Sequence, residues 1–253
     1  MAEGDTVLRA ARRIEDAIGG EEVGVSSPNP RGRVASLARL DGRRLERVEA
    51  RGKNLLFGFG DLALHSHLGM SGSWHVYRRG AAWRKPARSA WAVLRGEESE
   101  AVQFGGPTLR VLGAAALRRD PQLAGLGPDV LAADFDSGAG LRSLRAAPDR
   151  GLGDMLLDQR RVAGIGNIFK SEACFAARLD PWRRIEDLDD AELERVLLAA
   201  RELMLAAVAN GRQKERAVYR HAGRPCPVCG TPIASRGQGD SNRTTYWCRR
   251  CQR

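Results

Sequence analysis

Four cysteines near the C-terminus constrain the fold of this chain more than any other feature. Cys226 and Cys229 form one Cys-x-x-Cys pair, and Cys248 and Cys251 form a second pair after the segment 230–247. Two such pairs hold a zinc ion through four thiolates. Because four protein ligands leave no coordination position open, the sequence predicts one structural Zn2+. The segment between the pairs is long enough for two strands, with a turn at 237–242 and a second strand at 243–247. An alternative is a zinc knuckle that only closes the fold or binds a protein.

The charge balance favours a polyanionic partner. Lys and Arg together number 41 against 31 for Asp and Glu, which gives a net charge of +10. Nucleic acid is the first expectation, although a soluble protein from an arginine-rich proteome has the same balance. No apolar run approaches the roughly 18–20 residues that span a bilayer, so no membrane partner is expected. The start of the chain lacks the apolar core of a signal peptide, and we expect a cytoplasmic, nucleoid-associated protein.

The pattern of apolar residues changes twice along the chain. Residues 5–18 have the spacing of an amphipathic helix that Gly19 ends. From 22 to 119, short apolar runs separated by Gly, Pro and charged residues indicate an antiparallel sandwich or barrel. These runs are VASLARL, NLLFGF, LALHSHL, GSWHVY, SAWAVL, EAVQF and LRVL. After a breaker-rich stretch at 120–128, helices are expected at 137–147, 152–158, 166–177 and 188–209, the last capped by Asp189 or Asp190.

A glycine turn in the helical part forms a candidate anion site. Gly164 and Gly166 permit a tight turn, and Asn167 stands where a helix N-cap is expected. The free amides at a helix start, together with the helix dipole, suit a phosphate. Arg160 and Arg161 precede the turn and strengthen this interpretation.

The first residues hold a second candidate site. Ala2 is small, and a small second residue permits removal of Met1, which leaves a free amine beside the Glu3 carboxylate. An α-amino group has an ordinary pKa of about 7.7–8.0 against about 10.4 for lysine, so more of it is neutral at pH 7. Such an amine is prepared to attack an aldehyde-like carbon. The alternative is a frayed chain end ahead of a helix.

Several motifs together resemble the formamidopyrimidine-DNA glycosylase and endonuclease VIII family of base-excision repair enzymes, nearer to the endonuclease VIII branch in its actinobacterial form. The resemblance covers essentially the whole chain. Its motifs are E-G-D-T after Ala2, R-G-K ending at Lys53, H-L-G-M-S-G-S-W at 67–74, L-D-Q-R-x-x-A-G-I-G-N ending at Asn167, and the zinc hairpin through C-x-x-C-Q-R.

The resemblance implies an α+β multidomain fold. Its parts would be an N-terminal β-sandwich with a leading helix at 1–120, a helix–two-turn–helix domain at 121–215 and a zinc-finger β-hairpin at 216–253. The implied partner is damaged DNA, and we expect a monomer.

The resemblance also implies the chemistry of the site. The N-terminal amine of Ala2 would attack C1′ of the damaged nucleotide, Glu3 would move protons at the sugar, and Lys53 would hold the phosphate or sugar. By itself, Lys53 reads as a surface lysine after a turn. Asn167 and Arg243, with Arg160 beside the glycine turn, would contact the DNA backbone around the everted nucleotide. Met70 would fill the gap left in the duplex, the alternative being a core methionine.

Two departures from the family pattern affect these expectations. The family begins with proline, whereas this chain has Ala2, whose primary amine can also form a Schiff base. The loop at 102–117 lacks the Arg and Phe that the formamidopyrimidine branch inserts opposite the lesion, and Arg110 is poorly placed to replace them.

The sequence therefore favours a DNA glycosylase with AP-lyase activity on oxidised bases, pyrimidines preferred. The alternative is a non-catalytic protein that binds DNA lesions or DNA structures and has lost the proline nucleophile. A zinc-stabilised RNA-binding factor is disfavoured, because the aromatic residues are scattered and form no stacking platform.

Overall fold

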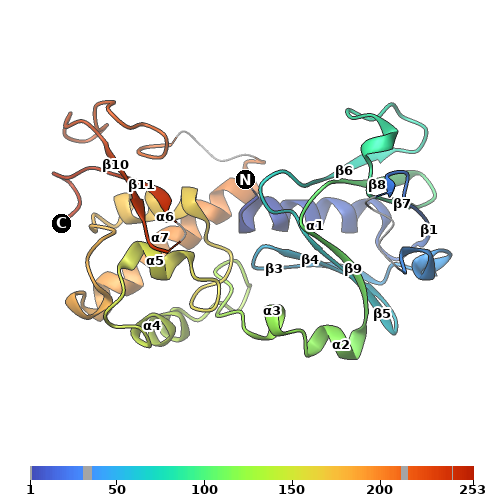
Figure 1. Ribbon diagram of the computed structural model, residues 1–253, viewed down its shortest axis with the longest axis horizontal. Coiled ribbons are helices and arrows are strands. Elements are labelled where there is room, and N and C mark those ends of the chain that lie inside the picture. The colour runs from blue at the N-terminus through green and yellow to red at the C-terminus, as the bar shows by residue number, and fades with distance from the viewer. Residues whose placement is uncertain (1, 31–35, 212–215, 241) are drawn as a thin grey trace. The chain divides into compact units, whose positions relative to one another are not determined.

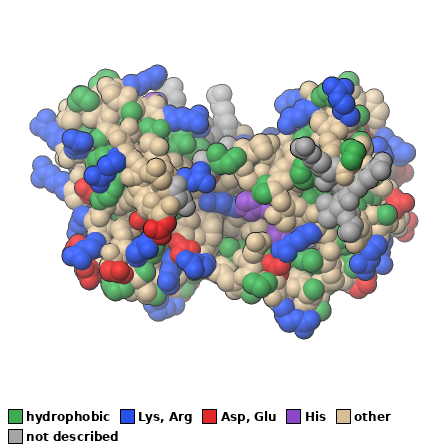
Figure 2. All heavy atoms as spheres, viewed as in Figure 1, with side chains coloured by type: hydrophobic (Ala, Val, Ile, Leu, Met, Phe, Trp, Pro, Cys, Tyr) green, Lys and Arg blue, Asp and Glu red, His purple; other side chains and the backbone are tan. Residues whose placement is uncertain are grey.

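The chain forms two compact units in a computed structural model that describes residues 2–30, 36–211, 216–240 and 242–253. The units are Met1–Ala124 and Gly125–Arg253, and each has its own hydrophobic core. Within the described ranges, no helix is both long and apolar enough to cross a membrane. Lys and Arg side chains are spread over the visible face of each unit (Figure 2).

The first unit is a β-sandwich with a leading helix, α1 (Gly4–Ile18). One sheet has the order β2-β1-β7-β8-β6 and the other the order β3-β4-β5-β9, with antiparallel pairing throughout. The strands are β1 (Glu22–Ser26), β2 (Arg43–Arg44), β3 (Arg47–Arg51), β4 (Asn54–Phe59), β5 (Leu62–His67), β6 (Ser73–Arg78), β7 (Ala92–Arg95), β8 (Ser99–Phe104) and β9 (Thr108–Gly113).

Helix α1 lies between the two sheets (Figure 1). Its apolar residues, Val7 and Ile14 among them, are buried in one cluster with Phe57 of β4 and Leu94 of β7. Side chains alternate along a strand, so only one face of each strand meets the helix. This arrangement confirms the predicted sandwich behind an N-terminal helix.

One predicted strand in this unit is wrong. The run VASLARL was expected to be extended, but Leu37–Leu40 forms a 3-10 helix, η2, after Ser36 at a φ of +99°. A left-handed residue at this point breaks an extended strand, while Leu37 and Leu40 still reach the core. Val34 and Ala35 lie outside the described residues. A second 3-10 turn, η3 (Ala87–Ser89), precedes β7.

The first unit ends in two short helices that the sequence pattern did not indicate. These are α2 (Ala114–Arg118) and α3 (Pro121–Ala124). Asp120 starts α3, because its Oδ1 accepts the amides of Gln122 at 3.1 Å and Leu123 at 3.3 Å.

The second unit is helical and carries a β-hairpin. Its elements are α4 (Ser137–Arg145), α5 (Leu152–Leu157), α6 (Asn167–Ala176), η4 (Ile185–Asp187), α7 (Asp190–Ala209), β10 (Ala234–Gln238) and β11 (Arg243–Trp247). The four predicted helices and the second hairpin strand are confirmed. Asp189 caps α7 in a reciprocal capping box with Glu192.

The predicted N-cap of α6 is displaced by one residue. Gly166 is the N-cap, with extended φ −114° and ψ −170°, and Asn167 is the first helical residue. The prediction failed because the asparagine side chain makes a tertiary contact with the hairpin instead of capping its own helix.

Candidate functional site

The N-terminal residues are held in place. The backbone nitrogen of Ala2 donates to the carbonyl of Gly69 at 3.4 Å, and Ala2 packs against the sandwich core. Glu3 is the N-cap of α1, where its carbonyl accepts the amides of Thr6 at 3.0 Å and Val7 at 3.1 Å. The Glu3 residue is only 1% exposed. A frayed end does not describe this segment, because both residues are built into the unit.

A second carboxylate, that of Asp5, follows Glu3 two residues later in the sequence. Asp5 is buried, and this burial raises its pKa even though Arg9 pairs with it at 3.1 Å. In the sequence, Asp5 is marked only by its place in the E-G-D-T motif, two residues after Glu3.

The loop after β5 carries Met70 beside the N-terminus. Gly69 has a φ of +57°, and a Cβ on it would lie 2.7 Å from Cδ of Pro107, so the turn requires glycine. Met70 is 61% exposed, which excludes the alternative of a core methionine. Because the carbonyl of Gly69 accepts a hydrogen bond from the Ala2 nitrogen, Ala2 lies against the loop that carries Met70.

Lys53 lies in the tight hairpin loop between β3 and β4. This loop has two residues, and Gly52 occupies its first position with a φ of +57°. Asn54, which follows Lys53, pairs with His67 at the end of β5. Burial and the nearby Lys53 charge both lower the pKa of His67.

His67 connects the loop that contains Lys53 with the loop that contains Gly69 and Met70. Its Nδ1 accepts the Gly69 amide at 3.2 Å, so the neutral ring carries its proton on Nε2. Three separate segments therefore meet at the end of β5. They carry Ala2 with Glu3, Lys53, and Met70. The only sign of His67 in the sequence is its place at the start of the H-L-G-M motif, and its role as a link could not be predicted from that motif.

Arg160 and Arg243 line one pocket in the second unit. The pocket has a volume of about 340 Å³, and Arg150, Arg161, Asp154 and Asp240 also line it. Arg160 pairs with Asp158 through two bonds of 3.0 and 2.9 Å, and this pairing lowers the pKa of Asp158. Two guanidinium groups far apart in sequence thus face the same space.

Asn167 joins α6 to the hairpin next to Arg243. Its Nδ2 donates to the Thr244 carbonyl at 2.8 Å, and its buried Oδ1 has no hydrogen-bond partner among the described residues. One turn later, the buried Lys170 ammonium donates to the Thr245 hydroxyl, which donates to Gln238 at 2.7 Å. The start of α6 and the hairpin are therefore fixed to each other. Sequence reasoning missed Lys170, because a lysine inside a helix normally faces solvent.

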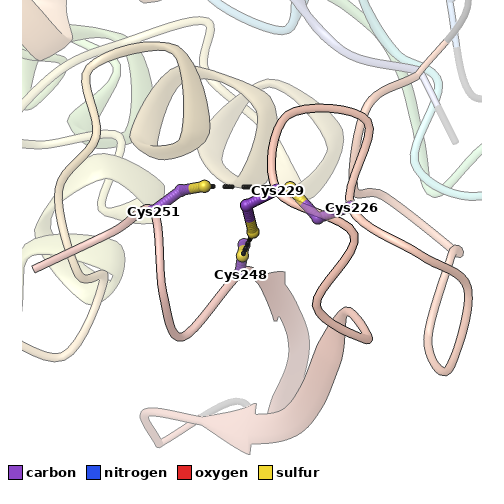
Figure 3. Close-up of side chains that lie close together, drawn as sticks. All are labelled: Cys226, Cys229, Cys248 and Cys251. Carbon is purple, nitrogen blue, oxygen red and sulfur yellow. Dashed lines mark hydrogen bonds between the residues drawn. The ribbon is translucent and has the colours of Figure 1, made fainter.

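The four cysteines of the tail converge on one point (Figure 3). The sulfur–sulfur distances are 3.9 Å for Cys226 and Cys251 and 3.5 Å for Cys229 and Cys248. A tetrahedron with Zn–S bonds of about 2.3 Å has edges of about 3.8 Å, so the sulfurs fit a zinc ion and not disulfides. This clustering confirms the prediction of one structural zinc.

The fifth cysteine takes no part in the cluster. Cys174 is fully buried in the helical core, and burial raises the pKa of its thiol to about 12. The prediction of a core residue is confirmed.

Three known protein families match successive parts of the chain. Residues 1–108 match the N-terminal domain of formamidopyrimidine-DNA glycosylase, residues 126–218 its H2TH domain, and residues 223–253 the zinc finger found in FPG and IleRS. The structure is similar to a Lactococcus lactis formamidopyrimidine-DNA glycosylase bound to DNA containing an AP site, with a TM-score of 0.84, 24% identity and full coverage of both chains.

Sequence relatives extend over the whole chain. A "Probable endonuclease 8 2" of Streptomyces coelicolor is 40% identical over 100% of this chain and 94% of its own length. A DNA-(apurinic or apyrimidinic site) lyase of Mycolicibacterium smegmatis is 34% identical over 100% of this chain and 99% of its own length. The chain belongs to the formamidopyrimidine-DNA glycosylase and endonuclease VIII family.

Proposed function

We propose that this protein is a base-excision repair DNA glycosylase for oxidised bases, pyrimidines favoured, and an AP lyase that acts through the amine of Ala2. The observation that carries the proposal is the meeting of Ala2, the buried Glu3 and the Lys53 hairpin around the end of β5. These are a nucleophile, a proton-transfer group and a cation, the three groups that displacement at a sugar carbon needs. The proposed site of action is nucleoid DNA in the cytoplasm, with the protein acting as a monomer.

The proposed reaction begins after removal of Met1. The neutral amine of Ala2 attacks C1′, the bond from C1′ to the base breaks, and the base leaves with a proton. Opening of the sugar ring, with proton transfer through Glu3, gives a Schiff base between Ala2 and C1′. Loss of the C2′ proton then expels the 3′ phosphate and cuts the strand, and water releases the sugar fragment. A primary amine supports each of these steps, so Ala2 can replace the family's proline.

The second unit would hold the DNA backbone. Arg243 and Arg160 present guanidinium groups to one pocket, and Asn167 lies at the start of α6 beside the same hairpin. Guanidinium groups and helix N-termini are both suited to phosphate oxygens. We propose that Met70, which is exposed, fills the space left by the everted nucleotide.

Trapping with borohydride tests the nucleophile. Incubation of the protein with a duplex containing an abasic site should give a covalent adduct after reduction, and peptide mass spectrometry should place it on an N-terminal Ala2. The intact mass should show that Met1 is absent, because a retained Met1 would leave the Ala2 nitrogen in a peptide bond, where it cannot form a Schiff base. Absence of an adduct and of base release on every lesion would leave the non-catalytic binding protein as the better description.

Arg243→Ala should weaken binding to every duplex and reduce the salt dependence of binding. Loss of one phosphate contact lowers the slope of log affinity against log salt by about 1. Fluorescence anisotropy across a salt series measures both quantities. Arg39→Ala, which removes the same charge from an exposed position in the first unit, is the control and should leave the slope unchanged. Equal slopes for both variants would remove Arg243 from the interface.

A further inference from the structure

A row of polar side chains crosses the face of the second sheet that points away from α1. Asn54 pairs with His67, and His65 pairs with Arg110, so Asn54, His65 and Arg110 share one face of β4, β5 and β9. Their neighbours in sequence, such as Leu55 and Leu64, occupy the opposite face in the core. His65 is fully buried, and Asn54 is 8% exposed. Buried polar side chains such as His65 and Asn54 need hydrogen-bond partners, because unsatisfied polar groups in the interior are costly.

Hydrogen bonds join the row into one directed chain. The Arg110 guanidinium donates to Oδ2 of Asp120 at 2.6 Å and, through Nε, to Nδ1 of His65 at 3.1 Å. His65 Nε2 lies 2.9 Å from Oδ1 of Asn54, and Asn54 Nδ2 donates to the carbonyl of Arg51 at 3.2 Å. Because a guanidinium only donates, Nδ1 must accept, and the neutral ring carries its proton on Nε2. This tautomer in turn sets the orientation of the Asn54 amide.

This chain of hydrogen bonds ends at the loop that carries Lys53. Arg51 and Asn54 are the paired residues that flank the loop of Gly52 and Lys53. The Asn54 amide bridges the two strands, because it is attached to one strand and donates to the other. The far end is equally fixed, since Asp120 also starts α3. A continuous series of hydrogen bonds across four strands, from β9 through β5 and β4 to β3, therefore reaches the two residues that flank the loop of Lys53.

The charge state of His65 preserves this series of hydrogen bonds. Burial, the Arg110 charge and, more weakly, His67 lower its pKa to about 4, and only Asp120 opposes them. A second proton would sit on Nδ1 against the Nε–H of Arg110. At neutral pH the ring stays neutral, so it accepts from Arg110 and donates to Asn54 at the same time.

We propose that His65 and Asn54 are positioning residues for Lys53 and that Arg110 and Asp120 fix their orientation. The proposal rests on the role given to Lys53 in the proposed function. It makes His65 a residue that serves the reaction without touching DNA. Misplacement of a catalytic group by about 1 Å can cost on the order of 100-fold in rate.

A double-mutant cycle tests whether this chain of hydrogen bonds acts through Lys53. His65→Leu and Asn54→Ala are each made in the natural chain and in a Lys53→Ala background. Strand cleavage of an abasic duplex is measured at single turnover, below the unfolding transition of every variant. In the natural chain each substitution should lower the rate by about 10- to 100-fold. In the Lys53→Ala background neither should lower it further, because the group that they position is absent.

Ser66→Ala is the matched structural control. Ser66 is buried on the same strand but on the opposite face, where its hydroxyl accepts from Trp74 at 3.1 Å and Gln103 at 3.0 Å. It should lower the unfolding temperature and show no coupling to Lys53. If His65→Leu and Asn54→Ala slow cleavage by the same factor in both backgrounds, their role is only structural and the proposal is overturned. Asn54→Ala decides the question if His65→Leu does not fold.

Binding to a duplex with a tetrahydrofuran abasic analogue provides a second readout that needs no chemistry. The same cycle should show coupled losses of affinity, because a misdirected Lys53 cannot hold the lesion. If the natural protein neither cleaves nor traps abasic DNA, the proposed function fails, and the affinity cycle still decides whether His65 acts through Lys53. Additive losses of affinity would overturn the inference whatever the result for catalysis.

Discussion

Glu3→Gln should abolish most base release and strand cleavage while DNA binding is retained. Proton transfer by a positioned side chain contributes roughly 10²- to 10⁴-fold in rate, which is about 3–5 kcal/mol. An amide of nearly the same shape cannot take up or deliver that proton. The Glu3 side chain does not cap α1, so the helix start is kept, and the loss of a negative charge there costs about 0.3–1 kcal/mol. The catalytic effect should therefore exceed the effect on stability.

Single-turnover kinetics on lesion-bearing duplexes and anisotropy on the same DNA measure the two quantities. Asp16→Asn is the control, because it removes a carboxylate from an exposed position of the same helix. Its rate should match that of the natural chain. Unchanged glycosylase activity in Glu3→Gln would remove Glu3 from its assigned role. A loss of DNA affinity equal to the loss in rate would assign Glu3 to binding instead.

Cys248→Ser should release the zinc and weaken DNA binding strongly. Cys248 is fully buried, and its sulfur is one of four that meet at the metal site. Structural zinc contributes an apparent binding free energy of about 10–16 kcal/mol in zinc-finger peptides, and that energy maintains the fold of the finger. Without it, β10 and β11 lose their support at one end, and the Asn167 and Lys170 bonds to β11 are too few to replace it. Arg243 would no longer be held against its pocket.

Zinc content by atomic emission should fall from one ion per chain to near zero, with a parallel loss of affinity in anisotropy. Cys174→Ser is the matched control, since Cys174 is equally buried but lies outside the cluster. It should lower the unfolding temperature and keep the zinc. Full DNA affinity in zinc-free Cys248→Ser would exclude the hairpin from the DNA interface.

Much of the fold could be predicted because the signals are local. The amphipathic spacing of α1 and α7, the Asp189 cap and the paired Cys-x-x-Cys turns each depend on residues within a few positions of one another. The second hairpin strand was predictable because the zinc pairs fix both ends of the segment. The prediction failed at Leu37–Leu40, where an apolar run forms a 3-10 helix after a left-handed serine. Apolar content alone does not distinguish a strand from a short helix that reaches the same core.

The sequence by itself determined which groups the protein carries: a small second residue next to Glu3, a lysine after a tight glycine turn and four cysteines at zinc spacing. Only the tertiary structure decided which of these groups meet. Ala2 reaches Gly69 through sandwich packing, and His65 comes between Arg110 and Asn54 through the register of three strands. Register depends on contacts between residues far apart in sequence, and a slip of one residue would turn His65 to the other face of the sheet. For that reason the chain of hydrogen bonds from Asp120 to the Lys53 loop could not be inferred from the sequence.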